Sequence, residues 1–248
     1  MGPAPYRPYN AKRSHYSWHW YWDTGNGESG NTGPHQCDLA RWGMNKNEHP
    51  VSIYSTGGLY GLRHEELPPE KKTPGRMVYG GVEVYGRDKT SQETPNTQTA
   101  VYKYNDGTMI EFEVRGLYTN HEGSQGQEVG NVFYGSEGWL EISGSTWKAF
   151  RERERKPFAG SKEGERGRDG NHWANFIDVL RSGKKEDMHA DIAEGYFSSA
   201  LPLLANISYR VGRQLKFMGE YEKFADDHEA DTLLSRAYRP PYVVPEEV

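Results

Sequence analysis

The segment TQTAVYKYNDGTMIEFEVRG, residues 97–116, constrains the fold more than any other part of the sequence. Two strand-like runs flank the dipeptide Asp106-Gly107, which is favoured in two-residue hairpin turns. From Ile110 to Arg115 apolar and charged residues alternate, so one face of the hairpin is expected to be buried and the other to face water. The sequence therefore predicts an antiparallel sheet with one covered face.

Further strands precede and follow this hairpin. Residues 51–57 are strand-like, and VGNVFYGSEGWLEISG, residues 129–144, repeats the hairpin pattern with its turn at 135–138. The charged and glycine-rich segment 151–170 reads as a solvated loop. Most of the predicted strands thus lie in the first two thirds of the chain.

The predicted helices come last. In NHWANFIDVLRSG apolar residues recur at helical spacing, with Asn171 as the N-cap and Gly183 as the stop. Residues 191–213 predict a second helix, which starts with a sequence similar to a capping box. Pro202 in its interior is expected to kink this helix or to end a first helix. Strands followed by helices predict an α+β fold, an antiparallel or mixed sheet with helices on one face.

Charge and composition exclude several classes of protein. At 248 residues one large domain is expected, and the net charge of -5, with both signs interspersed, gives no basic surface for nucleic acid. The single cysteine, Cys37, excludes an intrachain disulfide framework and a multi-cysteine metal site. No apolar run approaches the roughly 20 residues of a membrane helix. We therefore expect neither nucleic acid nor membrane as a partner.

The best candidate for chemistry lies in WDTGNGESGNTGPHQCDLARWG, residues 22–43. Its glycines predict a shaped loop, and Pro34 at a first helical position predicts a short helix that ends at Gly43. His35 would then lie in the first turn, where the helix dipole disfavours the imidazolium form.

Asp38 and Trp42 would share one side of that helix with His35. This layout suits a histidine that a carboxylate orients toward a loop-lined cleft. In the alternative, His35 and Asp38 only stabilise the start of the helix.

These residues also carry a resemblance to a known family. GESGNTGPHQCDLARW resembles the segment that follows the nucleotide domain in Gfo/Idh/MocA sugar oxidoreductases, especially in their bacterial branch. FYGSEGWLEISG, HWANFIDVLRSGKKEDMHADIAEGYFSSALPLLANISYRVGRQLKF and DDHEADTLLSRAYRPPYVVP match in the same order. The resemblance implies an α+β C-terminal domain for substrate binding and oligomerisation, with a large open, mostly antiparallel mixed sheet that carries helices on one face. Residues 1–248 would form this single domain, with a crossover and loop at 1–30 and an extended tail at 225–248.

Two motifs of that family are missing from the sequence. A strand and a helix joined by G-x-G-x-x-G would hold the dinucleotide, and an E-K-P segment supplies the lysine that the family uses as an acid and base. We therefore expect no dinucleotide-binding domain in this chain, and NAD or NADP only in an intact parent enzyme. The chain would be a gene fragment or a stand-alone domain, and its compartment, cytoplasmic or periplasmic, is left open.

The resemblance also assigns roles to residues of the glycine-rich stretch. His35 stands at the family's catalytic histidine, which handles the hydroxyl proton together with the lysine. Asn31 stands where many relatives have an aspartate; because an amide is no base, it is expected to hydrogen-bond a sugar hydroxyl or to orient His35. Asp38 matches a second acidic position, with a structural or orienting role beside the substrate.

Other residues are weaker candidates for the same site. Trp18, Trp20 and Trp22 predict a platform for stacking a sugar, with core packing or a partner interface as the alternative. His121 either lines the cleft or lies in a surface loop.

The sequence does not predict a metal site. His15 and His19 have the spacing of zinc ligands, and His35 and Asp38 could complete a set, but the sequence around the first two is not clearly helical.

Three classes of function remain. The first is the substrate-binding part of an NAD(P)-dependent sugar or cyclitol oxidoreductase, inactive in hydride transfer as this chain alone. The second is a carbohydrate-binding or scaffold module without turnover. The third is a redox-assisted glycoside hydrolase or lyase. The expected partners are a sugar or cyclitol and further copies of the chain, through the open face of the sheet.

Overall fold

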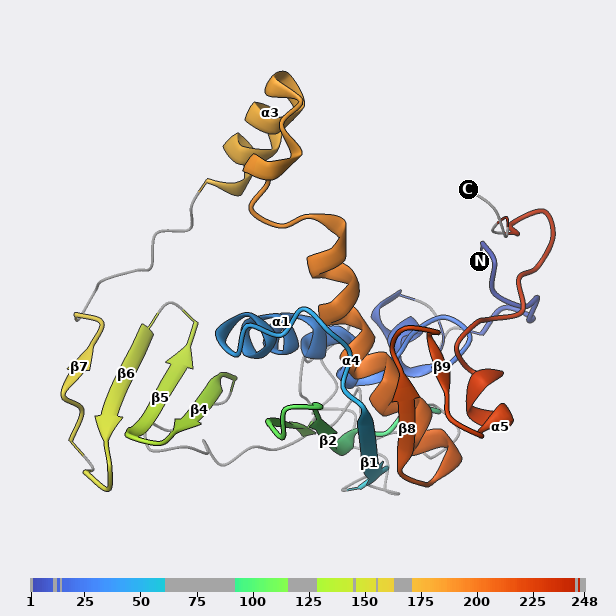
Figure 1. Ribbon diagram of the computed structural model, residues 1–248. Coiled ribbons are helices and arrows are strands. Elements are labelled where there is room, and N and C mark those ends of the chain that lie inside the picture. Colours follow the sequence, from blue (N-terminus) through green and yellow to red (C-terminus); the bar gives the residue numbers. More distant parts are fainter. Residues whose placement is uncertain are drawn as a thin grey trace, which may run out of the picture. The chain divides into compact units, whose positions relative to one another are not determined.

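The computed structural model describes residues 2–10, 13, 15–60, 92–115, 129–144, 146–154, 156–162, 171–243 and 245. The chain divides into two compact units. Unit 1 comprises Met1–Pro34, Glu48–Tyr118 and Ser199–Val248, and unit 2 comprises His35–Asn47 and Thr119–Ser198. Helices α1 (Gly27–Gly43) and α4 (Ile192–Val211) each run from one unit into the other (Figure 1). A single domain over the whole chain stays a prediction.

Unit 1 contains a five-stranded antiparallel sheet. Its strands are β1 (Ser52–Gly58), β2 (Thr97–Lys103), β3 (Met109–Arg115), β8 (Leu215–Met218) and β9 (Lys223–Phe224), in the order β3-β2-β1-β8-β9. The predicted hairpin is confirmed: β2 pairs with β3 in antiparallel register, and Gly107 in the turn has a φ of 88°. A positive φ is the conformation that glycine adopts without strain, which explains its place in the turn.

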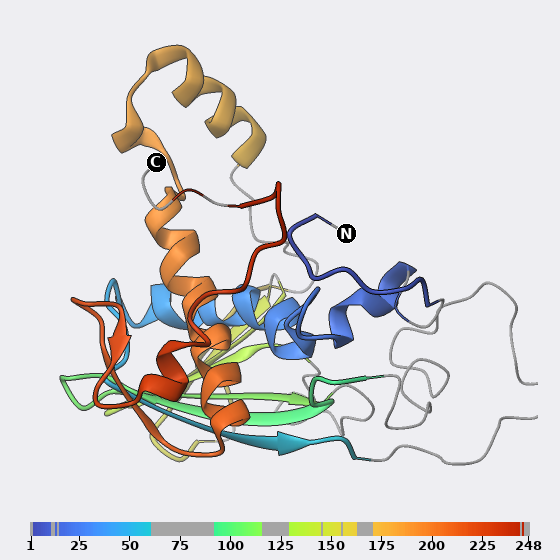
Figure 2. The same ribbon diagram turned by 90° about the vertical axis from the view of Figure 1, so that its right-hand side faces the viewer.

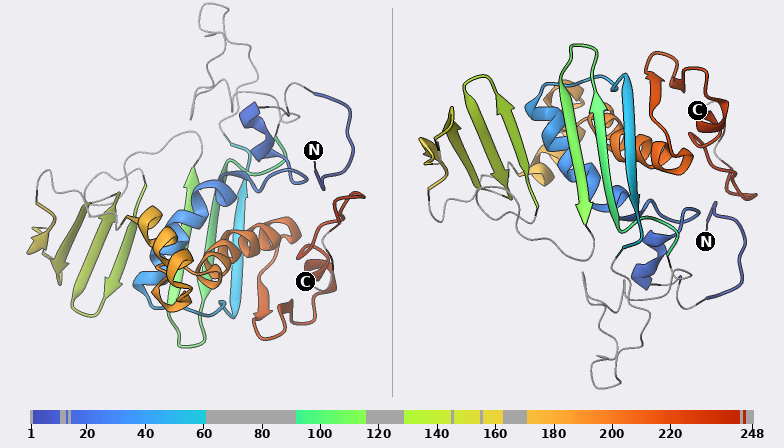
Figure 3. Two further views of the ribbon diagram at one scale, coloured as in Figure 1. Left: turned by 90° about the horizontal axis from the view of Figure 1, so that it is seen from above. Right: turned by 90° about the horizontal axis from the view of Figure 1, so that it is seen from below.

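Helices cover one face of this sheet. From Ile110 to Arg115 in β3 the apolar residues are buried and the charged residues between them are exposed, as the alternation predicted, whereas Met109 at the start of the strand is exposed. The Tyr102 hydroxyl donates to the Leu201 carbonyl of α4 at 3.0 Å, and the Ser55 amide donates to the Ser208 hydroxyl at 2.9 Å. Figures 2 and 3 show α4 on the same face of the sheet as the first part of α1. The core of unit 1 therefore lies between these helices and the strands.

Large side chains of the strands and of α4 fill that core. Burial of apolar surface from water is the main force that stabilises such a layer. The most deeply buried apolar residues of unit 1 include Trp20, Tyr21, Ile53, Ala100, Tyr102, Leu201, Ala205, Leu215 and Phe224.

Unit 2 contains a second antiparallel sheet. Its strands are β4 (Asn131–Gly135), β5 (Gly138–Ser143), β6 (Thr146–Arg151) and β7 (Ala159–Gly160), in that order. The predicted turn at 135–138 is confirmed, and the Trp139 and Phe150 rings stack at 4.7 Å across β5 and β6. The α+β class is confirmed. The described strands form two antiparallel sheets, however, where one large sheet was expected, and β7 lies inside the segment that was read as a loop.

Helix α3 (His172–Ser182) in unit 2 has the predicted ends. The Asn171 side chain accepts from the Ala174 amide at 3.0 Å, and Gly183 takes the left-handed conformation with φ 69°. A short 3-10 turn, η5 (Lys185–Asp187), follows. The predicted apolar face of α3 is nevertheless exposed in unit 2, with Trp173 at 72% and Leu180 at 66%. The sequence thus predicted both ends of the helix correctly. The apolar face that it also predicted is not buried in unit 2.

The two ends of the described chain meet in unit 1. The N-terminal segment leads into a 3-10 helix, η2 (His15–Trp20), and the tail contains a short helix, α5 (His228–Asp231). The Arg239 guanidinium donates to the carbonyls of Gly2 and Ala4 at 2.7 and 3.0 Å. Among the described residues no helix has the length and apolar character needed to span a membrane.

Candidate functional site

His35 lies inside helix α1 and not at its start. The helix begins at Gly27, so His35 falls in roughly its third turn and Pro34 is an interior residue. The expectation of a short helix with His35 in the first turn is therefore wrong, and so is the argument that the helix dipole acts on its ring, since that effect falls off within one turn. Only the end of the helix at Gly43 is as predicted.

The glycines of this stretch serve close packing more than loop formation. A Cβ at Gly33 would lie 3.0 Å from Pro202 and 3.2 Å from the Phe112 ring, and a Cβ at Gly27 would lie 2.8 Å from the Thr94 side chain. Glycine weakens a helix by about 1 kcal/mol relative to alanine, but it lets the backbone approach its neighbours. All of these neighbours are far away in the sequence, which is why the pattern was mistaken for a loop.

The His35 side chain is exposed on α1. It makes no hydrogen bond or ion pair with the residues that the structure describes. Asp38 and Trp42 follow at helical spacing and are also exposed, so the predicted shared side is confirmed. The described contacts of Asp38 do not include His35, however. Its Oδ1 accepts a hydrogen bond from the Ser198 hydroxyl at 2.6 Å.

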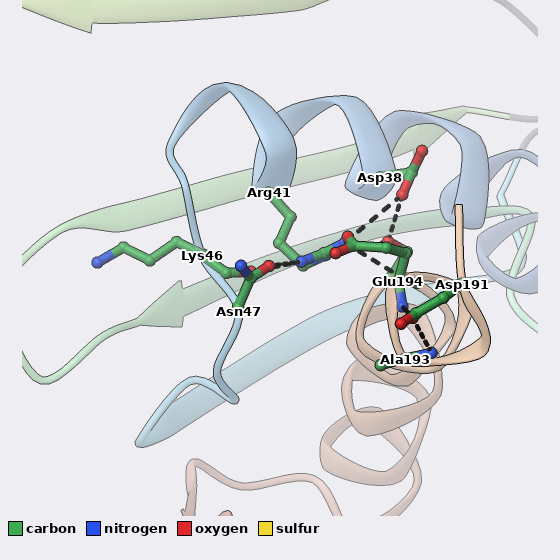
Figure 4. Close-up of polar contacts among 8 residues, drawn as sticks. Asp38, Arg41, Lys46, Asn47, Asp191, Ala193 and Glu194 are labelled. Atoms are coloured by element: carbon green, nitrogen blue, oxygen red, sulfur yellow. Dashed lines mark hydrogen bonds and ion pairs between the residues drawn. The ribbon is translucent and has the colours of Figure 1, made fainter. Parts of the chain in front are cut away.

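A buried arginine organises the surroundings of Asp38 in unit 2 (Figure 4). The Arg41 side chain is only 1% exposed and pairs with the carboxylate of Glu194, at the start of α4. Its Nε donates to the Ser198 hydroxyl at 3.1 Å, and its Nη1 donates to the Lys46 carbonyl at 2.7 Å and to Asn47 Oδ1 at 2.6 Å. The guanidinium therefore joins the last turns of α1 to the first turns of α4.

The Ser198 hydroxyl is part of the same network. It accepts from Arg41 and donates to Asp38, and the residue is 3% exposed. With Asp38 also 3.8 Å from the guanidinium, one cation lies between two carboxylates. This network holds the Asp38 carboxylate beside the start of α4.

The start of α4 differs in part from the predicted capping box. Asp191 accepts from the amides of Ala193 and Glu194 at 2.7 and 3.3 Å, so it caps the helix as expected. The Glu194 side chain does not complete the box but turns to Arg41 instead (Figure 4). Of the two effects expected of Pro202, a kink or the end of a first helix, the second is wrong, because α4 continues through Pro202 to Val211.

The remaining predicted site residues are scattered. Asn31 is half-buried on α1, one helical turn before His35. Trp18 is 48% exposed and stacks on His19, whereas Trp20 is buried in the core of unit 1 and offers no ring face to a ligand. Trp22 is half-buried. His121 lies outside the described residues.

Metal binding and thiol chemistry have no support in the part of the chain that the structure describes. No three of its histidine, cysteine, aspartate or glutamate side chains gather as a metal site requires. Burial, and then the nearby Asp38 carboxylate, raise the pKa of the Cys37 thiol to about 12. The thiol is therefore protonated near neutral pH and is a poor nucleophile.

The glycine-rich stretch also does not fit a nicotinamide dinucleotide. A pyrophosphate site needs a strand, a glycine turn and a helix in succession. Here the glycines of 27–43 are themselves helical, and the element before them is the 3-10 helix η2. No described strand leads into a helix through such a turn.

Sequence reasoning missed the Arg41 network. The Asp38 and Arg41 spacing of three residues is a signal for a surface pair on one helix. That Arg41 is buried and that Glu194 reaches it depend on how α1 packs against α4, 153 residues further along the chain.

Comparison with known proteins agrees with this fold. Residues 1–57 match the family model described as the oxidoreductase family, C-terminal alpha/beta domain. No curated protein matches the chain in sequence.

Three solved structures share the fold. A protein from Thermotoga maritima assigned as an oxidoreductase has a TM-score of 0.53 at 13% identity over 81% of this chain and 50% of its own. A protein from Erwinia carotovora atroseptica, also assigned as an oxidoreductase, has a TM-score of 0.52 at 13% identity over 84% of this chain and 54% of its own. The aldose-aldose oxidoreductase of Caulobacter crescentus, complexed with glycerol, has a TM-score of 0.50 at 14% identity over 84% and 52%.

At these identities the likeness shows the fold, and the chain spans about half the length of each structure. The fold is that of an α+β domain shared with oxidoreductases. The family match over residues 1–57 agrees with the resemblance found in the sequence, and the described residues share the fold of these oxidoreductases.

Proposed function

We propose that this chain is the substrate-binding part of an oxidoreductase that acts on a CH–OH group of a sugar or cyclitol. One observation carries the proposal: His35, inside the segment that matches the family model, presents its ring to solvent and makes no bond to the described residues. Such an imidazole can accept the hydroxyl proton while hydride leaves the carbon.

Neighbouring residues would position the substrate. Asn31, one turn before His35, can exchange hydrogen bonds with a second hydroxyl, since its amide both donates and accepts. Asp38, held by Ser198, keeps one carboxylate oxygen for a ligand or water. The Arg41 network would keep this side of α1 in place.

In this proposal the hydride acceptor is NAD or NADP, and it is held outside the residues described. About half of each matched oxidoreductase lies beyond the region that this chain covers, which leaves room for a second domain. Hydride transfer requires the acceptor to be held against the reacting carbon. The proposed enzyme would oligomerise through the exposed face of the five-stranded sheet.

Binding titrations test the substrate part of the proposal. Calorimetry with glucose, xylose and myo-inositol should show heat with at least one of them, and His35→Ala should weaken binding about tenfold if the ring bonds a hydroxyl. His189→Ala, an exposed histidine in the loop before α4, is the matched control and should bind as the wild type does. Equal affinity for wild type and His35→Ala would contradict the role of His35.

A fusion tests turnover. The half of the Thermotoga maritima protein that the match leaves uncovered would be joined to this chain, and nicotinamide reduction measured with each sugar. The proposal expects turnover that His35→Ala abolishes and His189→Ala preserves. A folded fusion that binds both ligands and shows the same rate with and without His35 would refute it.

The exposure of Trp18 favours a second candidate, carbohydrate binding without turnover. An exposed indole face packs well on the C–H surface of a pyranose. In this case Trp18→Ala would weaken sugar binding, His35→Ala would leave it unchanged, and the fusion would show no turnover.

A further inference from the structure

Two arginines of unit 1 meet the same short segment, Trp22 to Asn26. The Arg210 guanidinium carbon lies 5.2 Å from the centre of the Trp22 ring. Arg236 donates to Asn26 Oδ1 at 2.7 Å and to the Gly25 carbonyl at 3.4 Å. Residues from the end of α4 and from the C-terminal tail thus bring two positive charges to one place.

The nearby carboxylates are already engaged with other cations. Asp23 pairs with Arg7 at 2.5 Å and with Arg13 at 3.4 Å. Glu93 pairs with Arg13 at 2.8 Å through one oxygen and accepts the Trp22 amide at 3.0 Å through the other.

Among the residues that the structure describes, no carboxylate therefore bonds Arg210 or Arg236. Arg210 makes no hydrogen bond or ion pair with the described residues, and the bonds of Arg236 go to neutral oxygens. Both side chains are exposed, so an anion from solvent can reach them. Burial, and then the like charge of Arg236, lower the pKa of Arg210, while Glu93 opposes this effect. A bound anion would relieve that repulsion.

Two aromatic rings lie beside these arginines. Trp22 and Tyr209 are half-buried, with ring centres 6.5 Å apart and planes tilted by 37°. Burial, and then the nearby Tyr60, raise the pKa of the Tyr209 hydroxyl, so it remains a neutral hydrogen-bond donor at neutral pH. Ring faces of this kind pack on the C–H surface of a sugar, and guanidinium groups bind carboxylate or phosphate oxygens in pairs.

We propose that Trp22, Tyr209, Arg210 and Arg236 form a binding site for an anionic sugar. The two guanidiniums would bind its carboxylate or phosphate group, and the two rings would pack against its pyranose. The site consists of residues of unit 1 alone and requires no chemistry at His35.

Calorimetry at low salt tests this site with the purified chain. D-glucuronate represents a sugar acid, glucose 6-phosphate a sugar phosphate, and glucose the neutral ring. We expect at least one anionic sugar to bind at least about tenfold more tightly than glucose, and added salt to weaken it. Whichever of the two binds identifies the source of the anion. If neither binds, or if glucose binds equally well, the proposal is overturned.

Substitutions test whether the anionic sugar binds at the proposed residues. Arg210→Gln should weaken the binding of the anionic sugar about tenfold, because one charge-assisted contact is lost. Arg115→Gln, whose guanidinium pairs with Glu113 at an exposed end of β3, is the matched control and should have no effect. Wild-type affinity in Arg210→Gln would refute the site. Since Arg236 also supports the 23–26 segment, Arg236→Lys, checked for folding by circular dichroism, is preferred to a neutral replacement and should weaken binding too.

Inorganic phosphate, which has no sugar ring, tests whether the Trp22 and Tyr209 rings contribute to binding. If it binds as tightly as glucose 6-phosphate, the rings contribute nothing and the assignment to a sugar is wrong. Weaker binding of phosphate, together with a loss of glucose 6-phosphate affinity in Trp22→Ala, supports it. Failure of these tests leaves the proposal for His35 intact, because that proposal depends on neutral sugars and on a different variant.

Discussion

Arg41 is the residue on which the surroundings of the candidate site most depend. Its side chain is only 1% exposed in unit 2, and its charge is stabilised there by Glu194, Ser198 and two oxygens of the loop after α1. A buried charge is tolerated only when it is paired and hydrogen-bonded. The network therefore both compensates the buried charge of Arg41 and holds the Asp38 carboxylate in place.

Removing the carboxylate of Glu194 should destabilise the protein. Breaking a fully buried pair costs about 3–5 kcal/mol, but Glu194 is 39% exposed, so we expect Glu194→Gln to lose about 1–3 kcal/mol. Urea unfolding would measure this loss. Glu137→Gln, an exposed glutamate in the β4–β5 turn, should show no comparable change. Equal midpoints for the two variants would show that the pair adds nothing.

His49 predicts a pH dependence of stability. Burial lowers its pKa below the ordinary 6.5, and the nearby Glu222 opposes this only in part. The unfolded chain then binds a proton more readily than the folded one, so stability is full above about pH 6.5 and falls as the pH drops below it. Unfolding midpoints measured from pH 7.5 to 5 would show the fall. The substitution His49→Gln should reduce this loss of stability, and His189→Gln should not. The lowered pKa of Asp227 affects stability only below its ordinary value of 3.8, which is outside this pH range.

Among the elements, α1 differs most from the sequence-based expectation. Both α1 and α4 contain an interior proline, and both continue through it. An interior proline costs about 3 kcal/mol, which tertiary packing must offset. In unit 1 the close approach of Gly33 to Pro202 and Phe112 shows how this packing arises.

Two glycines at helix starts should respond in opposite directions. Gly27 has a φ of +68°, and an added Cβ would lie 2.8 Å from Thr94, so Gly27→Ala should lose about 1–3 kcal/mol. Gly195 in α4 has open space around it, so Gly195→Ala should gain up to about 1 kcal/mol. Thermal unfolding of the two variants would decide. A Gly27→Ala protein as stable as the wild type would show that α1 does not start as described.

For the molecule as a whole, we expect no oxidation by this chain alone. Mixed with NAD or NADP and any of the test sugars, the purified protein should give no reduced nicotinamide, because the described residues do not fit a dinucleotide. The absorbance of the reduced cofactor measures this directly. A rate that disappears in His35→Ala would overturn the expectation and show that the chain binds the cofactor itself.

The sequence was most informative where a structure depends on neighbours within a few residues. The Asp106-Gly107 turn, the alternation along β3 and both caps of α3 were predicted and are present. Each of them uses contacts between residues at most four apart or the two faces of one strand, and such contacts are encoded locally. The resemblance to a family could be found for a similar reason, since its glycine-rich motif occupies one continuous segment.

The errors concern contacts between distant segments. A Cβ at Gly27 would meet the Thr94 side chain, and the buried Arg41 pairs with Glu194, so both residues depend on partners far away in the sequence. None of these partners can be identified from spacing.

The sequence by itself determined the α+β class, the hairpins, helix α3 and the position of His35 in a family motif. Only the tertiary structure decided that the glycine-rich stretch is helical, that Trp20 is in the core, and which charges are compensated. The physical reason is that propensity and capping act over one or two turns, whereas burial and charge pairing depend on segments that only folding brings together.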